Sequence, residues 1–117
     1  MSKRSFISST GSQITYETSG TGYPLLLLHG FPRTRKTWEI LRPLLGSRFC
    51  LITPDRRGYG DSQVSSDHET YKLQQLTTDA LGVLDAIGAP ECLVVGHNRG
   101  APVARNLAFT QPDRVRG

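Results

Sequence analysis

The sequence predicts an α/β fold with a mostly parallel sheet, because short apolar runs alternate with segments of helical periodicity. Three of these runs are four residues long and wholly apolar, at residues 25–28, 49–52 and 92–95. Strands of this kind are buried on both faces, as they are in parallel sheets covered by helices. The 117 residues are 37% hydrophobic and 21% charged, which is a globular composition and a length suited to one domain.

The first half of the chain begins with an antiparallel hairpin. Side chains alternate over residues 6–18 around a break rich in turn-forming residues, and the apolar run at residues 25–28 follows as a strand. Next comes a predicted helix that ends at Gly46 and has apolar residues on one side: Trp38, Leu41, Leu44 and Leu45. A second strand at residues 49–52 is closed by Pro54.

The second half repeats the pattern of strand and helix. Apolar residues recur at helical spacing from Leu73 to Ile87, and Gly88 ends that helix. The third apolar strand, at residues 92–95, is followed by a helix over residues 101–108. Parallel sheets of this type place their chemistry in the loops at the carboxyl ends of the strands. The three loops concerned span residues 29–32, 54–60 and 96–100.

The third loop, GHNRG at residues 96–100, has the spacing of a nucleophile elbow. In such a turn the backbone of the central residue, here Asn98, is strained and its side chain is exposed above the sheet. Glycines two positions either side let strand and helix approach closely. The helix behind the turn directs free N–H groups and positive partial charge toward a negative group in front of it. The sequence therefore predicts a reactive or binding site at Asn98.

The motifs HGFP at residues 29–32, PDRRGYGDS at residues 54–62 and GHNRGA at residues 96–101 together resemble the α/β-hydrolase superfamily. More narrowly, they resemble its haloacetate dehalogenase and epoxide hydrolase branch. The resemblance covers nearly the whole chain. It implies that residues 1–117 form the N-terminal part of a hydrolase core domain, an incomplete α/β-hydrolase fold whose cap domain and C-terminal part are absent.

The resemblance also assigns roles to residues. It implies that the backbone N–H groups of Phe31 and Arg99 form an oxyanion hole, and that Asn98 stands where the family has an Asp nucleophile. Asn98 departs from this pattern, because a neutral amide does not provide the charged oxygen that displacement requires. The family's acid and histidine follow the nucleophile, whereas His29, His68 and His97 all precede Asn98. We therefore expect the chain alone to be inactive.

The same resemblance also implies candidates for substrate binding. Arg99 is a candidate for holding an anion, although Pro102 stands where haloacetate dehalogenases usually have a second arginine. His29 and Trp38 are weaker candidates, and Trp38 has a core position on its helix as the alternative. His97 is expected to point away from the elbow in a structural role. Asp55 is expected to order its loop by side-chain to backbone bonds, and its charged neighbours to be solvated or to fix the loop: Arg56, Arg57 and Asp61.

Three interpretations of function remain open. The first is a hydrolase of small organic molecules, with a carboxylesterase-type parent as a variant of it. The second is a non-catalytic protein that binds a small molecule through Asn98, whose amide both donates and accepts hydrogen bonds. The third is an inactive fragment that self-associates through an exposed sheet edge.

Composition argues against several other classes of function. The net charge is +4, but the basic residues are scattered and form no basic helix face, so nucleic-acid binding is not expected. No stretch approaches the roughly 18 apolar residues of a membrane span. No apolar segment follows the basic start, so we expect a cytoplasmic protein. Cys50 and Cys92 lie in apolar runs without metal-ligand spacing, which predicts buried free thiols, no metal and no cofactor.

Overall fold

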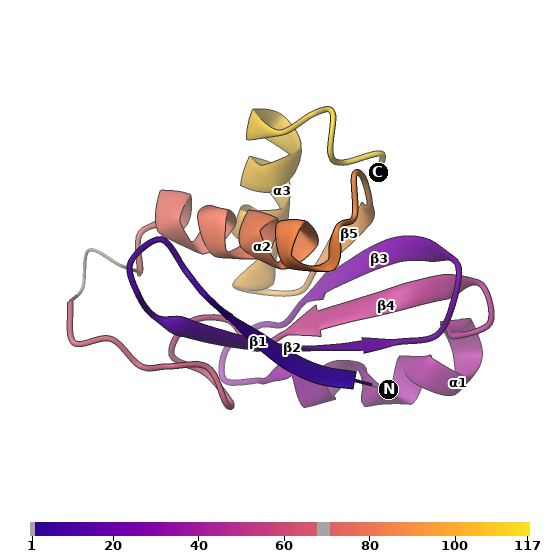
Figure 1. Ribbon diagram of the computed structural model, residues 1–117, viewed down its shortest axis with the longest axis horizontal. Helices are drawn as coiled ribbons and strands as arrows, with labels where there is room; N and C mark the ends of the chain where they lie inside the picture. The colour runs from indigo at the N-terminus through magenta and orange to yellow at the C-terminus, as the bar shows by residue number, and fades with distance from the viewer. Residues whose placement is uncertain (1, 68–70) are drawn as a thin grey trace.

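One five-stranded mixed sheet organises the computed structural model, which describes residues 2–67 and 71–117 (Figure 1). The strands are β1 (Ser2–Ile7), β2 (Gln13–Ser19), β3 (Tyr23–Leu28), β4 (Phe49–Pro54) and β5 (Leu93–Gly96), in the spatial order β1-β2-β4-β3-β5. The pairs β1–β2 and β2–β4 are antiparallel, whereas β3 is parallel to both β4 and β5. The predicted hairpin and the three predicted apolar strands are therefore confirmed.

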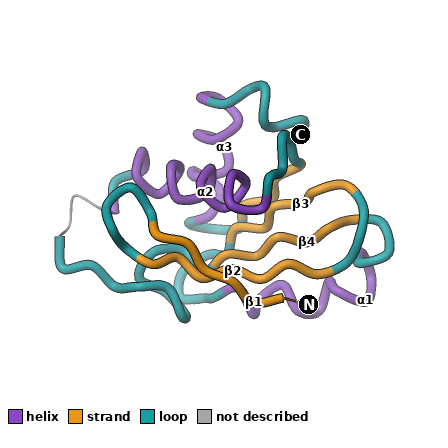
Figure 2. Tube along the Cα trace, viewed as in Figure 1, coloured by secondary structure: helices purple, strands orange, loops and turns teal. Residues whose placement is uncertain are grey.

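Helices cover both faces of this sheet. Figure 2 shows α2 (Leu73–Ile87) and α3 (Gly100–Thr110) on one face, and the helical segment before β4 on the other. The predicted helices at residues 73–87 and 101–108 are confirmed, and Gly88 caps α2 with a positive φ of 72°.

The predicted helix before Gly46 needs a correction. It is a 3₁₀ helix, η1 (Arg35–Leu41), followed by a single α-helical turn, α1 (Arg42–Leu45), which Gly46 ends. The physical reason is Pro43, which has no N–H and whose ring clashes with a helical carbonyl four residues earlier. A continuous α-helix therefore cannot pass through that position. The chain forms the tighter 3₁₀ helix before it, and a separate α-helical turn begins at Arg42.

Burial on both faces of β3 produces two core clusters. Leu26 and Leu28 pack into the larger cluster, beneath α2 and α3. Leu25 and Leu27 point the other way and pack with Leu51, against apolar residues of η1 and α1. All four leucines of β3 are at most 6% exposed, which explains why its sequence has no polar alternation. With β3 parallel to both neighbours, the loops after β3, β4 and β5 meet at one edge.

Both cysteines are free, and Cys92 is buried in the larger core cluster, as predicted, whereas Cys50 is only partly buried against it. Burial raises the pKa of the Cys92 thiol to about 11, so this thiol is unreactive near neutral pH. Within residues 2–67 and 71–117, no helix combines the length and the apolar character needed to cross a membrane.

Candidate active site

The turn between β5 and α3 has the backbone of a nucleophile elbow. Asn98 has a φ of 56°, and among the described residues it is the one non-glycine with a positive φ. The turn is closed by Gly100 N–H donating to His97 O (2.9 Å) and Ala101 N–H donating to Asn98 O (3.0 Å). His97 N–H donates to Leu28 O at 3.0 Å, which ties the turn to the end of β3. The side chain of Asn98 is consequently exposed at the edge where the three loops meet.

Two glycines permit the close approach of strand and helix at this turn. A Cβ on Gly96 would lie 2.8 Å from the Cα of Ala101, and a Cβ on Gly100 would lie 2.8 Å from the carbonyl carbon of Leu28. Real side chains do not tolerate such distances. The glycines two positions either side of Asn98 thus have the close-packing role that the elbow spacing predicts.

The backbone N–H of Phe31 points at the side chain of Asn98. It donates to Asn98 Oδ1 across 3.3 Å, although the two residues are 67 positions apart in the sequence. The N–H of Arg99, at the N-cap of α3, has no hydrogen-bond partner among the described residues. An unengaged donor next to Asn98 and a second donor from the loop after β3 are the groups that an oxyanion hole requires.

His29 lies beneath this site and not in it. Its ring is fully buried, Nδ1 lies 3.0 Å from Gly30 O, and Nε2 accepts the backbone N–H of Arg56 at 2.9 Å. Burial lowers the pKa of His29, so the neutral ring is favoured, with Nδ1 donating and Nε2 accepting. With both ring nitrogens engaged, the expectation that His29 contacts substrate is not supported. His29 instead joins the loop after β3 to the loop after β4.

Asp55 orders its loop as expected, but through a larger network than the sequence indicated. The carboxylate is fully buried and accepts the backbone N–H groups of Arg35 (2.7 Å) and Asp61 (2.8 Å). The guanidinium of Arg35 also bonds to Asp55, and its Nε donates to Glu17 Oε1 at 2.8 Å. Only 5% of Arg35 is exposed. This buried ion network fixes the segment between Phe31 and η1, and no pattern in the sequence indicated this role for Arg35.

Arg57 fixes its loop, which was one of the two roles expected of the charged residues there. It is 1% exposed, and its Nε and Nη2 donate to the two carboxylate oxygens of Asp79 on α2 at 2.9 and 2.8 Å. Nη2 also donates to Ser8 Oγ at 2.8 Å. The loop after β4 is thereby tied both to α2 and to the β1–β2 turn. Asp61, by contrast, is half exposed and pairs with Lys3 at 3.0 Å.

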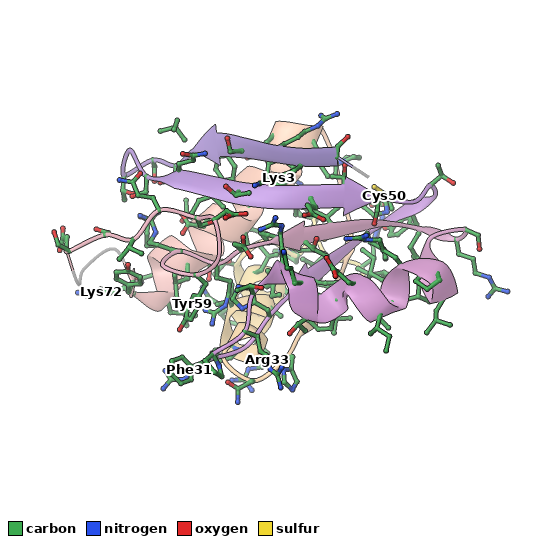
Figure 3. All side chains as sticks on the ribbon, turned by 90° about the horizontal axis from the view of Figure 1, so that it is seen from below. Lys3, Phe31, Arg33, Cys50, Tyr59 and Lys72 are labelled. Carbon is green, nitrogen blue, oxygen red and sulfur yellow. The ribbon has the colours of Figure 1, made fainter. Side chains whose placement is uncertain are left out.

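A cavity of about 300 Å³ opens beside the elbow. Its polar lining includes Arg56, Tyr59 and Arg99, and its other lining residues are Arg57, Tyr71, Leu73, Leu76, Pro102 and Val103. Tyr59 stands edge-on to Phe31, with ring centroids 6.3 Å apart, and both labelled side chains lie at the same edge of the molecule in Figure 3. The cavity is large enough for a small organic molecule.

The remaining predicted residues lie elsewhere. Trp38 packs against the smaller core cluster, in the core position that was its alternative, and not among the lining residues of the cavity. The side chain of His97 is exposed. His68 falls outside the described residues. Within residues 2–67 and 71–117, no group of three or more His, Cys, Asp or Glu side chains is arranged to hold a metal ion.

Comparisons with known proteins agree with this geometry. The model of the alpha/beta hydrolase fold family matches residues 23–117. An epoxide hydrolase B from Mycobacterium tuberculosis is 42% identical over 94 residues, which are 80% of this chain and 26% of that protein. A fluoroacetate dehalogenase from a Burkholderia species is 34% identical over 99 residues, which are 82% of this chain and 33% of that protein.

Solved structures give the same result. The crystal structure of an epoxide hydrolase from Vigna radiata superimposes with a TM-score of 0.93 at 27% identity, covering 99% of this chain and 38% of that one. The chain thus spans about a quarter to a third of the length of the curated relatives named here.

Proposed function

Because this chain belongs to the alpha/beta hydrolase fold family, we propose that it carries the nucleophile and oxyanion part of an epoxide hydrolase or dehalogenase. In this proposal, position 98 is the place of the nucleophile, and the N–H groups of Phe31 and Arg99 stabilise the developing oxyanion. The substrate is a small organic molecule that occupies the cavity beside the elbow.

The observation that carries the proposal is the contact between Phe31 N–H and Asn98 Oδ1. A donor from a distant loop is directed at the one side-chain oxygen that the strained turn exposes. In a loop with a purely structural role, a backbone N–H usually donates to a backbone carbonyl. The N–H of Phe31 instead donates to an exposed side chain, at the edge where the three loops meet. An aspartate at position 98 has the same shape as asparagine, and its oxygen would occupy the same place.

The chemistry would proceed in two steps. A carboxylate oxygen at position 98 forms a bond to the substrate carbon while the carbon–halogen or epoxide carbon–oxygen bond breaks, and the electron pair leaves with the halide or with the ring oxygen, which then takes up a proton. Water next gives a proton to a base, the role that the resemblance assigns to a histidine after position 98, and attacks the carbonyl carbon of the resulting ester; the ester carbon–oxygen bond then breaks, the alcohol leaves and the carboxylate at position 98 is restored. Negative charge develops on the carbonyl oxygen, where the N–H groups of Phe31 and Arg99 stabilise it. Asn98 cannot perform the first step, because its amide is a poor nucleophile.

The test uses the chain with Asn98→Asp. The variant is incubated with chloroacetate and, separately, with styrene oxide, and its peptides are mapped by mass spectrometry. No histidine follows position 98 in this sequence, so we expect the reaction to stop at the ester. The expected result is a substrate adduct at position 98 that the Asn98 chain and an Asn98→Leu variant do not form. Alkylation of Cys50 or Cys92 would be common to all three and serves as the background.

Two outcomes would favour the other interpretations. If no adduct formed at position 98, but an Asn98→Ser variant were acylated there by p-nitrophenyl acetate, the carboxylesterase interpretation would replace this one. Suppose that none of the three reagents reacted at position 98, and that a small molecule raised the melting temperature of the Asn98 chain but not of Asn98→Leu. Non-catalytic binding would then be the better explanation.

A further inference from the structure

We propose that Asn98 is a site of self-modification, at which water hydrolyses the side-chain amide and leaves an aspartate. The proposal rests on the function proposed above, because it states how position 98 gains the carboxylate that the reaction requires. The turn after β5 holds the two features that the hydrolysis needs, an amide open to solvent and an N–H donor directed at its oxygen.

The amide carbonyl of Asn98 is held in the way that an oxyanion hole holds a carbonyl. Phe31 N–H donates to Oδ1 at 3.3 Å, and the adjacent N–H of Arg99 has no partner among the described residues. Gly30 allows this approach, because a Cβ there would lie 2.5 Å from the Cβ of Asn98 and 3.2 Å from its Cγ. The loop after β3 therefore packs directly on the side chain whose oxygen it contacts.

These donors favour the slow step of amide hydrolysis. Water from solvent forms a bond to Cγ, and the electron pair of the carbonyl moves to Oδ1, where the N–H groups stabilise the developing charge. The tetrahedral intermediate then restores the C=O bond while the Cγ–Nδ2 bond breaks. The nitrogen takes up a proton from the attacking water and leaves as ammonia. Transfer of the remaining acidic proton gives a carboxylate at position 98 and an ammonium ion.

The turn opposes the route by which asparagine usually loses its amide. That route closes a five-membered ring between Cγ and the backbone nitrogen of the next residue, here Arg99, and yields both aspartate and isoaspartate. Ring closure requires rotation of the peptide group between the two residues. Ala101 N–H holds Asn98 O at 3.0 Å, and Gly100 N–H holds His97 O at 2.9 Å. Direct attack by water consequently gives aspartate alone.

Asn106 is the other asparagine of the sequence and provides an internal control. It lies within α3, is partly buried, and its Nδ2 donates to Thr77 Oγ1 at 2.9 Å. Among the described residues, no N–H donates to its Oδ1. Folding should therefore protect the amide of Asn106, whereas it should activate that of Asn98.

The experiment follows both asparagines by peptide mapping while the chain is incubated at mildly alkaline pH, either folded or unfolded in urea. We expect Asn98 to hydrolyse at least about tenfold faster in the folded chain, because only folding brings the donors to its oxygen. The product in the folded chain should be aspartate without isoaspartate. Asn106 should react more slowly in the folded chain than in urea.

Two variants isolate the N–H of Arg99. Arg99→Pro removes this N–H, and the φ of −67° at position 99 is one that proline adopts. Arg99→Ala removes the same side chain and keeps the N–H. We expect hydrolysis at Asn98 to be about a hundredfold slower in Arg99→Pro than in Arg99→Ala, the usual loss for one oxyanion donor. If Arg99→Pro does not fold, as judged from its circular dichroism spectrum, the comparison of the folded and unfolded chain decides the question.

Three results would overturn the proposal: hydrolysis at Asn98 that is no faster in the folded chain than in urea, isoaspartate at position 98 in the folded chain, or equal rates in Arg99→Pro and Arg99→Ala. The adduct experiment on Asn98→Asp begins with the carboxylate in place, so its outcome does not depend on this hydrolysis. Failure of the self-modification is therefore distinguishable from failure of the proposed function.

Discussion

The left-handed backbone at Asn98 is the residue-scale feature on which the site depends. Asparagine tolerates this conformation better than most residues. The Cβ of alanine clashes with the backbone at a positive φ, whereas glycine has no Cβ. We expect Asn98→Ala to be less stable than Asn98→Gly by about 1 kcal/mol. Urea denaturation of the two variants measures the difference. Both lose the contact with Phe31 N–H, so that loss cancels in the comparison, and a more stable alanine variant would show that the turn is not left-handed.

His29 leads to a pH dependence at the same scale. Burial lowers the pKa of His29 from its ordinary value of 6.5, so the unfolded chain takes up a proton at a higher pH than the folded chain. The free energy of unfolding is therefore unaffected above that ordinary value, and decreases as the pH falls from it toward the lowered pKa. Urea denaturation between about pH 8 and pH 5 measures the effect.

The control for this prediction is another histidine. His29→Gln should remove the decrease, whereas His97→Gln, at an exposed position, should leave it in place. If His29→Gln kept the same pH dependence as the parent, the buried ring would not be its source.

Sequence patterns located the elbow but not the buried ion pairs near it. Asn98, Phe31 and Arg99 could be identified because fixed spacings and a known turn place them together. The partners of Arg35 and Arg57 could not be identified, because the sequence alone leaves open whether a charged loop residue is solvated or fixes the loop. Those partners lie 22 positions away in the case of Arg57 and Asp79, and only the folded chain brings them together.

At the scale of elements, α2 provides a matched pair of ionic contacts. Asp79 is bound by the fully buried guanidinium of Arg57, and Asp85 on the same helix pairs with Arg114 at 2.9 Å while being 61% exposed. Removing one partner of a buried pair leaves an uncompensated charge, so Asp79→Asn should lower the free energy of unfolding by about 3 kcal/mol. Asp85→Asn should lower it by no more than about 1 kcal/mol. Chemical denaturation of both variants provides the check; equal losses would mean that the Arg57 contact does not hold the loop to α2.

The elements themselves were largely predictable, and the exceptions have physical causes. Apolar runs and helical periodicity located β3, β4, β5, α2 and α3, because each buries a continuous face. The 3₁₀ winding of η1 depends on Pro43 and on contacts of Arg35 that no local pattern reveals. The strand order could not be read either, since it depends on which crossover places β4 between β2 and β3.

At the scale of the whole molecule, the sheet has two outer strands, and they differ. β1 carries Lys3 and Arg4, charges that oppose pairing with another strand. The outer edge of β5 pairs instead with the chain's own last residues. Cys92 N–H donates to Arg114 O (2.8 Å), Arg116 N–H donates to Cys92 O (2.8 Å), and Val94 N–H donates to Gly117 O (2.9 Å). Both outer strands of the described sheet thus have features that oppose pairing with another chain, and self-association through an edge stays a prediction.

This arrangement predicts what happens when the β5 edge is opened. Removing residues 114–117 frees the N–H and C=O of Cys92 and the N–H of Val94 and exposes a strand edge, so the shortened chain should associate at lower concentration than the full chain. Size-exclusion chromatography with light scattering over a concentration series measures this. The matched control is Arg114→Ala with Arg116→Ala, which removes the ion pairs of this segment with Asp85 and Glu91 but keeps its backbone. The control keeps the backbone hydrogen bonds along β5, whereas the shortened chain loses them. If the control associated as readily as the shortened chain, the loss of side-chain contacts, and not the open strand edge, would be the cause of association.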